Sequence, residues 1–246
     1  MPDMKAITIA EARRFKPELI ERKVDGSRMR FHHNTLLSNR DVNRNARYGH
    51  VLREVSKVNW KIRGEMALEF GNVLQLNKRE SWPSAKLFIF DIFEHNGKST
   101  THLSPRQARD LIDNILNDHR FDHLKTPEEF KTFEAGWKYI EEHDLEGLVL
   151  KDKNGECFKV KKYKEEKLPI VGYEKGKKKG AFIIERNGVR SKVSGTSEGH
   201  VRQYEALLKR GLKPLAEIEY LFLTGDGIPF QPKLRRIGTA DSLSTT

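Results

Sequence analysis

The stretch Lys23-Val24-Asp25-Gly26-Ser27-Arg28 decides how the first half of this chain is organised. A strand-like segment over 19–24 contains the lysine, Asp-Gly is a strong turn signal, and the arginine begins a second strand-like segment that ends at residue 32. The hexamer therefore predicts a hairpin that brings an amine close to a guanidinium. Taken alone, a good turn between two ordinary surface cations is the better interpretation.

Strand and helix signals alternate over the first 163 residues. Strand-like runs occupy 19–24, 28–32, 60–70, 86–93, 147–151 and 157–161. Two helix starts stand at Ser104-Pro105-Arg106-Gln107 and Thr126-Pro127-Glu128-Glu129, each with a capping residue, a proline and then Gln or Glu. Their expected buried faces are Ala108, Leu111, Ile112, Ile115 and Leu116 in the first helix, and Phe130, Phe133, Trp137 and Ile140 in the second. The pattern predicts a mixed α+β domain with helices inserted between strands.

After Tyr163 the pattern changes to short strands separated by glycines. Runs over 168–173, 181–185, 189–193 and 216–223 predict strands, and a helix over 197–210, closed by Gly211, interrupts them. About five short strands with one helix fit a small OB-fold β-barrel. We therefore expect two domains, 1–163 and 164–246, joined by the charged stretch 162–167.

Composition limits the function. The formal charge is +11, and between Lys151 and Gly180 eleven lysines stand against five acids, which favours a polyanionic partner. From charge alone, a solvated lysine-rich loop is an equally good interpretation. The single cysteine, Cys157, excludes a disulfide framework and a four-cysteine zinc site. No run is long and apolar enough for a secretory signal or a membrane span, so we expect no membrane association and a cytoplasmic location.

Four further motifs follow the hexamer in order. They are Gly64-Glu65, Phe88-Ile89-Phe90-Asp91, Glu146-Gly147-Leu148-Val149-Leu150-Lys151 and Phe158-Lys159-Val160-Lys161. The five motifs resemble those of the covalent nucleotidyltransferases, namely DNA ligases, RNA ligases and mRNA capping enzymes, whose patterns include K-x-D-G-x-R, E-G-x-x-x-K and a terminal K-x-K. The resemblance covers roughly residues 15 to 240. It implies an adenylyltransferase domain, ATP-grasp-like with antiparallel sheets and helices, ahead of the OB-fold.

These residue types suit nucleotidyl transfer. A lysine that attacks phosphorus must be neutral, although a free lysine has a pKa of about 10.4, and nearby cations and burial lower that pKa. Lys159 and Lys161 alternate along one strand, so both ammonium groups face the same side, where they can act on Lys23 and hold the phosphate. Glu146 and Glu65 offer oxygen ligands for Mg²⁺ or acceptors for a ribose.

The resemblance implies roles for individual side chains. The implied catalytic residues are Lys23, Glu146, Lys159 and Lys161; the implied ATP-binding residues are Glu21, Lys23, Arg28, Glu65, Phe90, Lys159 and Lys161; and the implied metal ligands are Glu146 and Glu65. Phe90 is expected to stack on the purine, with Phe88 on the same strand face as the alternative. Glu21 is expected to accept the adenine amino group, which favours ATP over GTP.

The resemblance also favours DNA ligases within the superfamily. Residues 170–176 and 180–183 look like their first two OB strands, and 193–196 like the segment before their OB helix. Ser38-Asn39-Arg40 resembles the segment that grips the 5′-phosphate of the nick, with Arg40 the candidate. The other candidate DNA contacts are Lys175, Lys177, Lys178, Lys179, Arg190 and Lys192.

The terminal basic pattern of these ligases is altered in this chain. Phe230 and Gly238 stand where the pattern has its first and last arginines, and Arg235 or Arg236 is the candidate to compensate. In the family this pattern helps to orient pyrophosphate during self-adenylylation. The alteration puts the efficiency of that first step in doubt.

The resemblance implies a minimal ATP-dependent DNA ligase of the phage or bacterial accessory type. It would use ATP and Mg²⁺ and, as a monomer, seal 5′-phosphate/3′-hydroxyl nicks in duplex DNA through lysyl-AMP and DNA-adenylate, serving replication, repair or recombination. About twenty residues before Lys23 and one cysteine leave no room for the extra N-terminal domain and zinc module of NAD-dependent ligases. The alternatives are an RNA ligase or capping-type nucleotidyltransferase, and a non-catalytic nucleic-acid-binding protein on the same scaffold.

Overall fold

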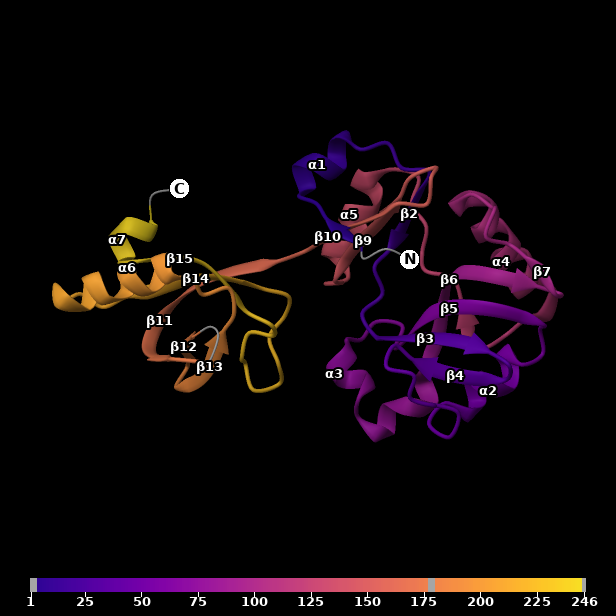
Figure 1. Ribbon diagram of the computed structural model, residues 1–246, viewed down its shortest axis with the longest axis horizontal. Helices are drawn as coiled ribbons and strands as arrows, with labels where there is room; N and C mark the ends of the chain where they lie inside the picture. Colours follow the sequence, from indigo (N-terminus) through magenta and orange to yellow (C-terminus); the bar gives the residue numbers. More distant parts are fainter. Residues whose placement is uncertain (1–3, 177–179, 245–246) are drawn as a thin grey trace. The chain divides into compact units, whose positions relative to one another are not determined.

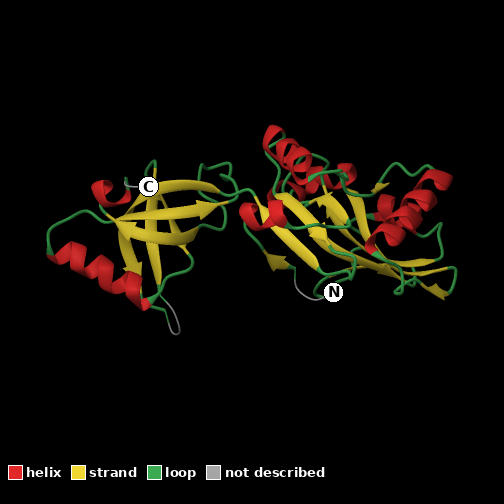
Figure 2. Cartoon of the chain, turned by 90° about the horizontal axis from the view of Figure 1, so that it is seen from above, coloured by secondary structure: helices red, strands yellow, loops and turns green. Residues whose placement is uncertain are grey.

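The computed structural model describes residues 4–176 and 180–244, and the chain divides into two compact units, Met1–Lys161 and Lys162–Thr246. The first unit contains two β-sheets with their helices, and the second contains a single sheet with two helices (Figures 1 and 2). Within the described ranges, no helix combines the length and the apolar composition that crossing a membrane requires.

One sheet of the first unit has the order β1-β10-β9-β2. Its strands are β1 (Lys5–Ala6), β2 (Leu19–Arg22), β9 (Gly147–Lys151) and β10 (Cys157–Lys161). Helix α5 (Phe133–Glu142) packs on β2 and β9, and α1 (Ile9–Arg14) contacts α5 (Figure 1). Their shared core is built from apolar side chains: Ala12, Ile20, Phe133, Trp137, Ile140, Leu148, Leu150 and Val160.

The other sheet of this unit has the order β4-β3-β5-β6-β7, with β8 paired to β6. The strands are β3 (Ser27–His32), β4 (Thr35–Ser38), β5 (Trp60–Ala67), β6 (Lys86–His95), β7 (Lys98–Ser99) and β8 (Leu124–Lys125). The helices around it are α2 (Gly49–Val55), α3 (Val73–Leu76), the 3₁₀ turn Arg79–Ser84 and α4 (Pro105–His119).

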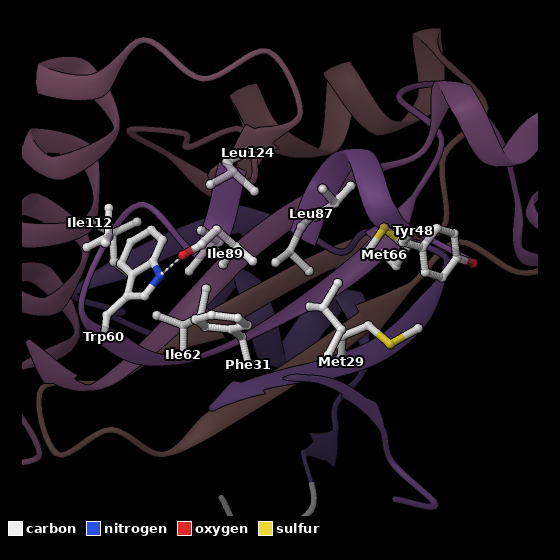
Figure 3. Packing of buried hydrophobic residues seen from close by; sticks show 14 of the residues in the cluster. Met29, Phe31, Tyr48, Trp60, Ile62, Met66, Leu87, Ile89, Ile112 and Leu124 are labelled. Atoms are coloured by element: carbon white, nitrogen blue, oxygen red, sulfur yellow. Dashed lines mark hydrogen bonds between the residues drawn. The ribbon is translucent and has the colours of Figure 1, made fainter. Parts of the chain in front are cut away.

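The hydrophobic core of the β4-β3-β5-β6-β7 sheet lies on one face of that sheet, because successive side chains of β5 point to opposite faces. Met29, Phe31, Ile62, Leu87 and Ile89 gather there with their neighbours, as Figure 3 shows. The polar atom of the buried Trp60 ring is satisfied in this core, since the indole N–H donates to the Val55 carbonyl at 2.9 Å (Figure 3).

The helix predicted from Ser104 is confirmed. Ser104 and Gln107 form a reciprocal capping box around Pro105, and Arg120 ends the helix in the left-handed region at φ 49°. Ile112 and Ile115 are buried on its inner face, as expected.

The predicted hairpin at Asp25-Gly26 is wrong. β2 pairs with β9, whereas β3 pairs with β4 and β5, so the two flanks of the turn belong to different sheets. A Cβ on Gly26 would lie 2.2 Å from the Met66 carbonyl oxygen, so the glycine permits a close approach of two backbones. Lys23 therefore stands where the chain crosses from one sheet to the other.

The helix predicted to start at Thr126 is also wrong in its start, because α5 begins at Phe133 with Thr132 as its cap. The preceding residues lie against β2 instead: the Arg22 N–H donates to the Glu128 carbonyl, and the Phe130 N–H donates to the Ile20 carbonyl. Satisfying the exposed edge of β2 outweighs the local capping signal.

The second unit has the strand order β13-β12-β11-β14-β15. The elements are β11 (Lys164–Glu174), β12 (Ala181–Arg186), β13 (Val189–Val193), α6 (Glu198–Lys209), β14 (Leu215–Tyr220), β15 (Lys233–Gly238) and α7 (Ala240–Leu243). Ser194 forms a parallel bridge with Lys233, so the two edge strands of the sheet meet (Figure 2). The predicted helix, capped by Ser197 and followed by Gly211 at φ 68°, is confirmed, whereas β15 was not predicted.

Candidate active site

Lys23 lies at the end of β2 with its amine bound to a buried carboxylate. Its backbone N–H donates to the Gly147 carbonyl at 2.8 Å, which continues the pairing of β2 with β9. Its Nζ donates to Glu146 Oε2 at 2.7 Å, and Lys161 Nζ lies 2.6 Å from Glu146 Oε1. Glu146, with a side chain only 6% exposed, thus bridges the ammonium group of Lys23, directly after β2, and that of Lys161, at the end of β10.

Gly147 explains why a glycine follows this glutamate. Its φ is +152°, and a Cβ there would stand 2.0 Å from the Val160 carbonyl oxygen. Only a residue without a side chain lets β9 and β10 approach this closely, which pairs Gly147 directly with Lys161. The close approach sets Glu146 beside Lys161.

Two further acids, Asp25 and Glu65, face the same group of charges. Burial, reinforced by the Glu146 carboxylate, raises the pKa of Asp25 to about 6, although the Val73 N–H donates to Asp25 Oδ2 at 3.3 Å. Burial likewise raises the pKa of Glu65 to about 7, with Lys23 and Arg28 opposing the rise. Neighbouring carboxylates whose charges disfavour each other's ionisation are stabilised by a cation bound between them.

A pocket opens beside Lys23, with about 490 Å³ of empty space that includes its open mouth. Five of the predicted nucleotide-binding residues line it: Glu21, Lys23, Arg28, Glu65 and Phe90. The Arg28 guanidinium lies 5.8 Å from the Phe90 ring centroid, and its Nε lies 4.0 Å from Glu65 Oε2. Lys161 and Glu146 adjoin the pocket through Lys23. Lys159 lies on β10 opposite Val149, which also lines the pocket.

The structure separates the two candidate phenylalanines. Phe88 is fully buried against Val24 and Ala67, whereas Phe90 lines the pocket. The pairing of β5 with β6 shifts at this point, so that Gly64 stands opposite Ile89 and Arg63 opposite Asp91, leaving Phe90 unpaired in a bulge. A bulge re-aims the side chains that follow it, so Phe90 is the aromatic ring available to a ligand.

Glu21 is not an exposed strand residue. It is only 2% exposed. Its Oε1 accepts from Arg109 Nη1 at 2.7 Å, and its Oε2 lies 2.8 Å from Lys151 Nζ. The sequence interpretation missed both cations. Lys151 stood in a quoted motif without a role, and the sequence carries no signal for Arg109, because only the structure shows that Glu21 is buried and needs cationic partners.

The described residues expected to bind DNA lie outside this pocket. Arg40 is exposed in the turn after β4, and Lys175, Arg190 and Lys192 are exposed in the second unit. Arg190 Nε bonds Glu185 at 3.0 Å, and Lys192 pairs with Glu174 at 2.5 Å. The predicted contacts Lys177, Lys178 and Lys179 lie outside the described residues.

The two arginines expected to compensate for the altered terminal pattern are held by acids of the neighbouring strand. Arg235 bonds Glu219, through Nε at 2.7 Å, and Arg236 bonds Glu217 at 2.5 Å. Both guanidinium groups remain partly exposed, with N–H donors besides those that bind the acids.

Within residues 4–176 and 180–244, no group of three or more His, Cys, Asp or Glu side chains is arranged to hold a metal ion. The fit of a cation therefore depends on Glu146, Glu65 and Asp25, which form no preformed cage; the Glu146 charge raises the pKa of both Asp25 and Glu65. Mg²⁺ commonly binds through one or two carboxylates together with substrate phosphates, so this arrangement suits it.

The family described as ATP dependent DNA ligase domain matches residues 4–167. A search of curated proteins by sequence gave no match.

Several solved structures share the fold. One comes from a structure-function analysis of Lig E DNA ligases and their DNA binding with a minimal scaffold; it has a TM-score of 0.71 at 16% identity and covers 97% of this chain and 100% of its own. A second, Pmar-Lig_PreS3, has a TM-score of 0.69 at 20% identity over 95% of this chain and 67% of its own. The ligase domain of M. tuberculosis LigD has a TM-score of 0.54 at 14% identity, covering 96% and 94%.

Proposed function

This chain belongs to the ATP-dependent DNA ligase family, and from that premise we propose that it seals nicks in duplex DNA through an adenylate carried on Lys23. The observation that carries the proposal is the buried Glu146 bridge between Lys23 and Lys161 at the edge of a pocket. An amine, a second cation and an acid at hydrogen-bonding distance are the groups that a nucleophilic lysine needs for activation and for phosphate binding.

In the first step the Lys23 amine attacks the α-phosphorus of ATP. The new bond joins Nζ to phosphorus, the bond to the β-phosphate oxygen breaks, and pyrophosphate leaves. Lys161 and Lys159 would hold the α-phosphate, while Arg28 and Glu65 would hold the sugar and phosphates. Phe90, unpaired in its bulge, would stack on the purine.

In the second step a 5′-phosphate oxygen of the nick attacks the same phosphorus, and the bond to Lys23 breaks. The strand then carries a 5′-adenylate. In the third step the 3′-hydroxyl attacks the 5′-phosphate, AMP leaves, and the strand is continuous. Glu146 and Glu65 would bind Mg²⁺, which neutralises phosphate charge in such transfers.

We infer that the second unit is an OB-fold that binds the duplex. Support comes from five strands whose edges meet through the Ser194–Lys233 bridge, with α6 inserted between β13 and β14. Arg40, Lys175, Arg190 and Lys192 are proposed to bind backbone phosphates, with the lysines 177–179. The functional domains 1–163 and 164–246, action as a monomer and a cytoplasmic site remain predictions.

Sealing of an end-labelled nicked duplex tests the proposal. We expect the wild-type protein with ATP and Mg²⁺ to lengthen the labelled strand, and Lys23→Ala to abolish this while retaining DNA binding. Lys138→Ala is the matched control, because Lys138 is 76% exposed on α5. Sealing by Lys23→Ala at the wild-type rate would overturn the nucleophile assignment.

The same assay separates the alternatives. An RNA ligase would seal a nick in RNA in preference to DNA, and a capping-type enzyme would become labelled by GTP rather than ATP. A non-catalytic binder would retain DNA without sealing it. DNA binding should weaken steeply as salt rises, and a flat salt response would contradict phosphate contacts by the basic residues of the second unit.

A further inference from the structure

Three buried charged side chains form an ion-pair network at the pocket wall. Arg109 of α4 donates through Nη1 to Glu21 Oε1 at 2.7 Å, and Lys151 Nζ lies 2.8 Å from the other oxygen, Glu21 Oε2. The exposed fractions of the three side chains are 8% for Arg109, 2% for Glu21 and 7% for Lys151. A carboxylate buried this deeply is retained only with close cationic partners, and here each oxygen has one.

Two members of this ion-pair network are exposed to the pocket. Glu21 and Lys151 both line the pocket, and Lys151 Nζ donates to the Phe90 carbonyl at 3.0 Å. Burial alone would lower the pKa of Lys151, but the Glu21 and Asp91 carboxylates outweigh it and raise that pKa above its ordinary value. One ammonium group therefore ties the bulge that presents Phe90 to the carboxylate beside it.

Arg109 is itself fixed on the far side from the pocket. Its Nε donates to Asp113 Oδ2 at 2.8 Å, one helical turn along α4, and the Thr126 hydroxyl donates to Asp113 Oδ1 at 2.7 Å. The guanidinium does not line the pocket, so it can act on a ligand only through Glu21. Its two tethers give it one orientation.

We propose that Arg109 is a positioning residue that sets the purine preference of this pocket by holding Glu21 as a fixed, acceptor-only wall. The inference rests on the proposed function, in which the base of the nucleotide occupies the pocket. A carboxylate has about four acceptor sites, and the two cations leave some of them open. Adenine offers an amino group at its sixth position, whereas guanine offers a carbonyl there, which would face another acceptor.

Self-adenylylation with labelled ATP and labelled GTP tests the proposal, with kcat/KM measured for each nucleotide. Arg109→Met keeps much of the side-chain length but leaves Glu21 with one cation, and we expect the ATP-to-GTP ratio to fall about ten-fold or more. Arg109→Lys keeps the charge and one donor, so we expect its ratio to stay within about three-fold of wild type. A merely structural role for Arg109 would depress both nucleotides equally, and an unchanged ratio in Arg109→Met would overturn the assignment.

If Arg109→Met cannot be purified, Asp113→Ala decides the question. Asp113 is 36% exposed, so its removal should loosen Arg109 without unfolding the unit. A lower ATP-to-GTP ratio supports the proposal, and a wild-type ratio overturns it. Failure of the proposed function looks different, because the wild-type protein would then be labelled by neither nucleotide.

Discussion

Replacing Asp25 by Asn should make the first unit more stable at high pH. Burial and the Glu146 charge raise the pKa of Asp25 from 3.8 to about 6, so the folded state holds its proton more tightly than the unfolded state does. Stability therefore falls as the pH rises between these two values, and the whole penalty is present above them. Asparagine removes the charge and keeps an oxygen for the Val73 N–H.

The size of the effect follows from the shift. A rise from 3.8 to about 6 corresponds to about 3 kcal/mol at about 1.4 kcal/mol per pKa unit, and relaxation around the site makes this an upper value. We expect Asp25→Asn to raise the free energy of unfolding by about 1–3 kcal/mol at pH 8. Well below pH 3.8 the carboxyl is protonated in both states, so the difference should vanish.

Urea denaturation followed by tryptophan fluorescence measures this directly. The chain's three tryptophans, Trp60, Trp82 and Trp137, all lie in the first unit, so the signal reports that unit alone. Asp110→Asn is the matched control, because Asp110 is 58% exposed, and we expect a change within about 0.5 kcal/mol at either pH. The reasoning is refuted if Asp25→Asn shows no gain at pH 8, or the same gain at both pH values.

Further predictions concern packing, backbone and charge. Phe88→Ala should lower the free energy of unfolding by about 3–5 kcal/mol, because Phe88 is fully buried, whereas Phe90→Ala should cost far less and raise the KM for ATP about ten-fold; the reverse pattern would contradict the assignment of Phe90 to the pocket. Gly147→Ala should destabilise the first unit by about 2–4 kcal/mol, since its Cβ would meet a carbonyl oxygen, while Gly49→Ala, at the open start of α2, should be neutral or stabilising; equal effects in urea denaturation would count against the close-approach explanation. Two lysines lower the pKa of the partly exposed Glu69 to about 2, so Glu69→Gln should cost about 1 kcal/mol at pH 7, and the difference should narrow as the pH falls from 4.5 towards 2; a difference that does not depend on pH would exclude the ion pairs as its source.

Sequence signals identified elements whose pattern is local. β9 and β10 were predicted with the bounds that the structure gives, because alternation and the flanking turns are contained within each strand. The Asp25-Gly26 signal failed because a turn does not specify which sheet each flank joins. That choice depends on β9 and β5, which lie far along the chain from β2.

The part of the candidate site that could be predicted consists of motif residues whose side-chain type indicates a role in nucleotide binding. Lys23, Arg28, Glu65 and Phe90 meet at one pocket, as their motifs led us to expect. The Arg109–Glu21 pair was not predictable, because its partners stand 88 residues apart and α4 carries no signal for the contact. Such a pair is fixed by tertiary packing.

The most direct test of the central claim is to incubate the full-length protein with ATP and Mg²⁺, digest it, and analyse its peptides by mass spectrometry. The account predicts an AMP adduct on the peptide that contains Lys23, which added pyrophosphate removes and which Lys23→Ala does not form. An unmodified Lys23 peptide in active protein, or an adduct on another lysine such as Lys161, would contradict it.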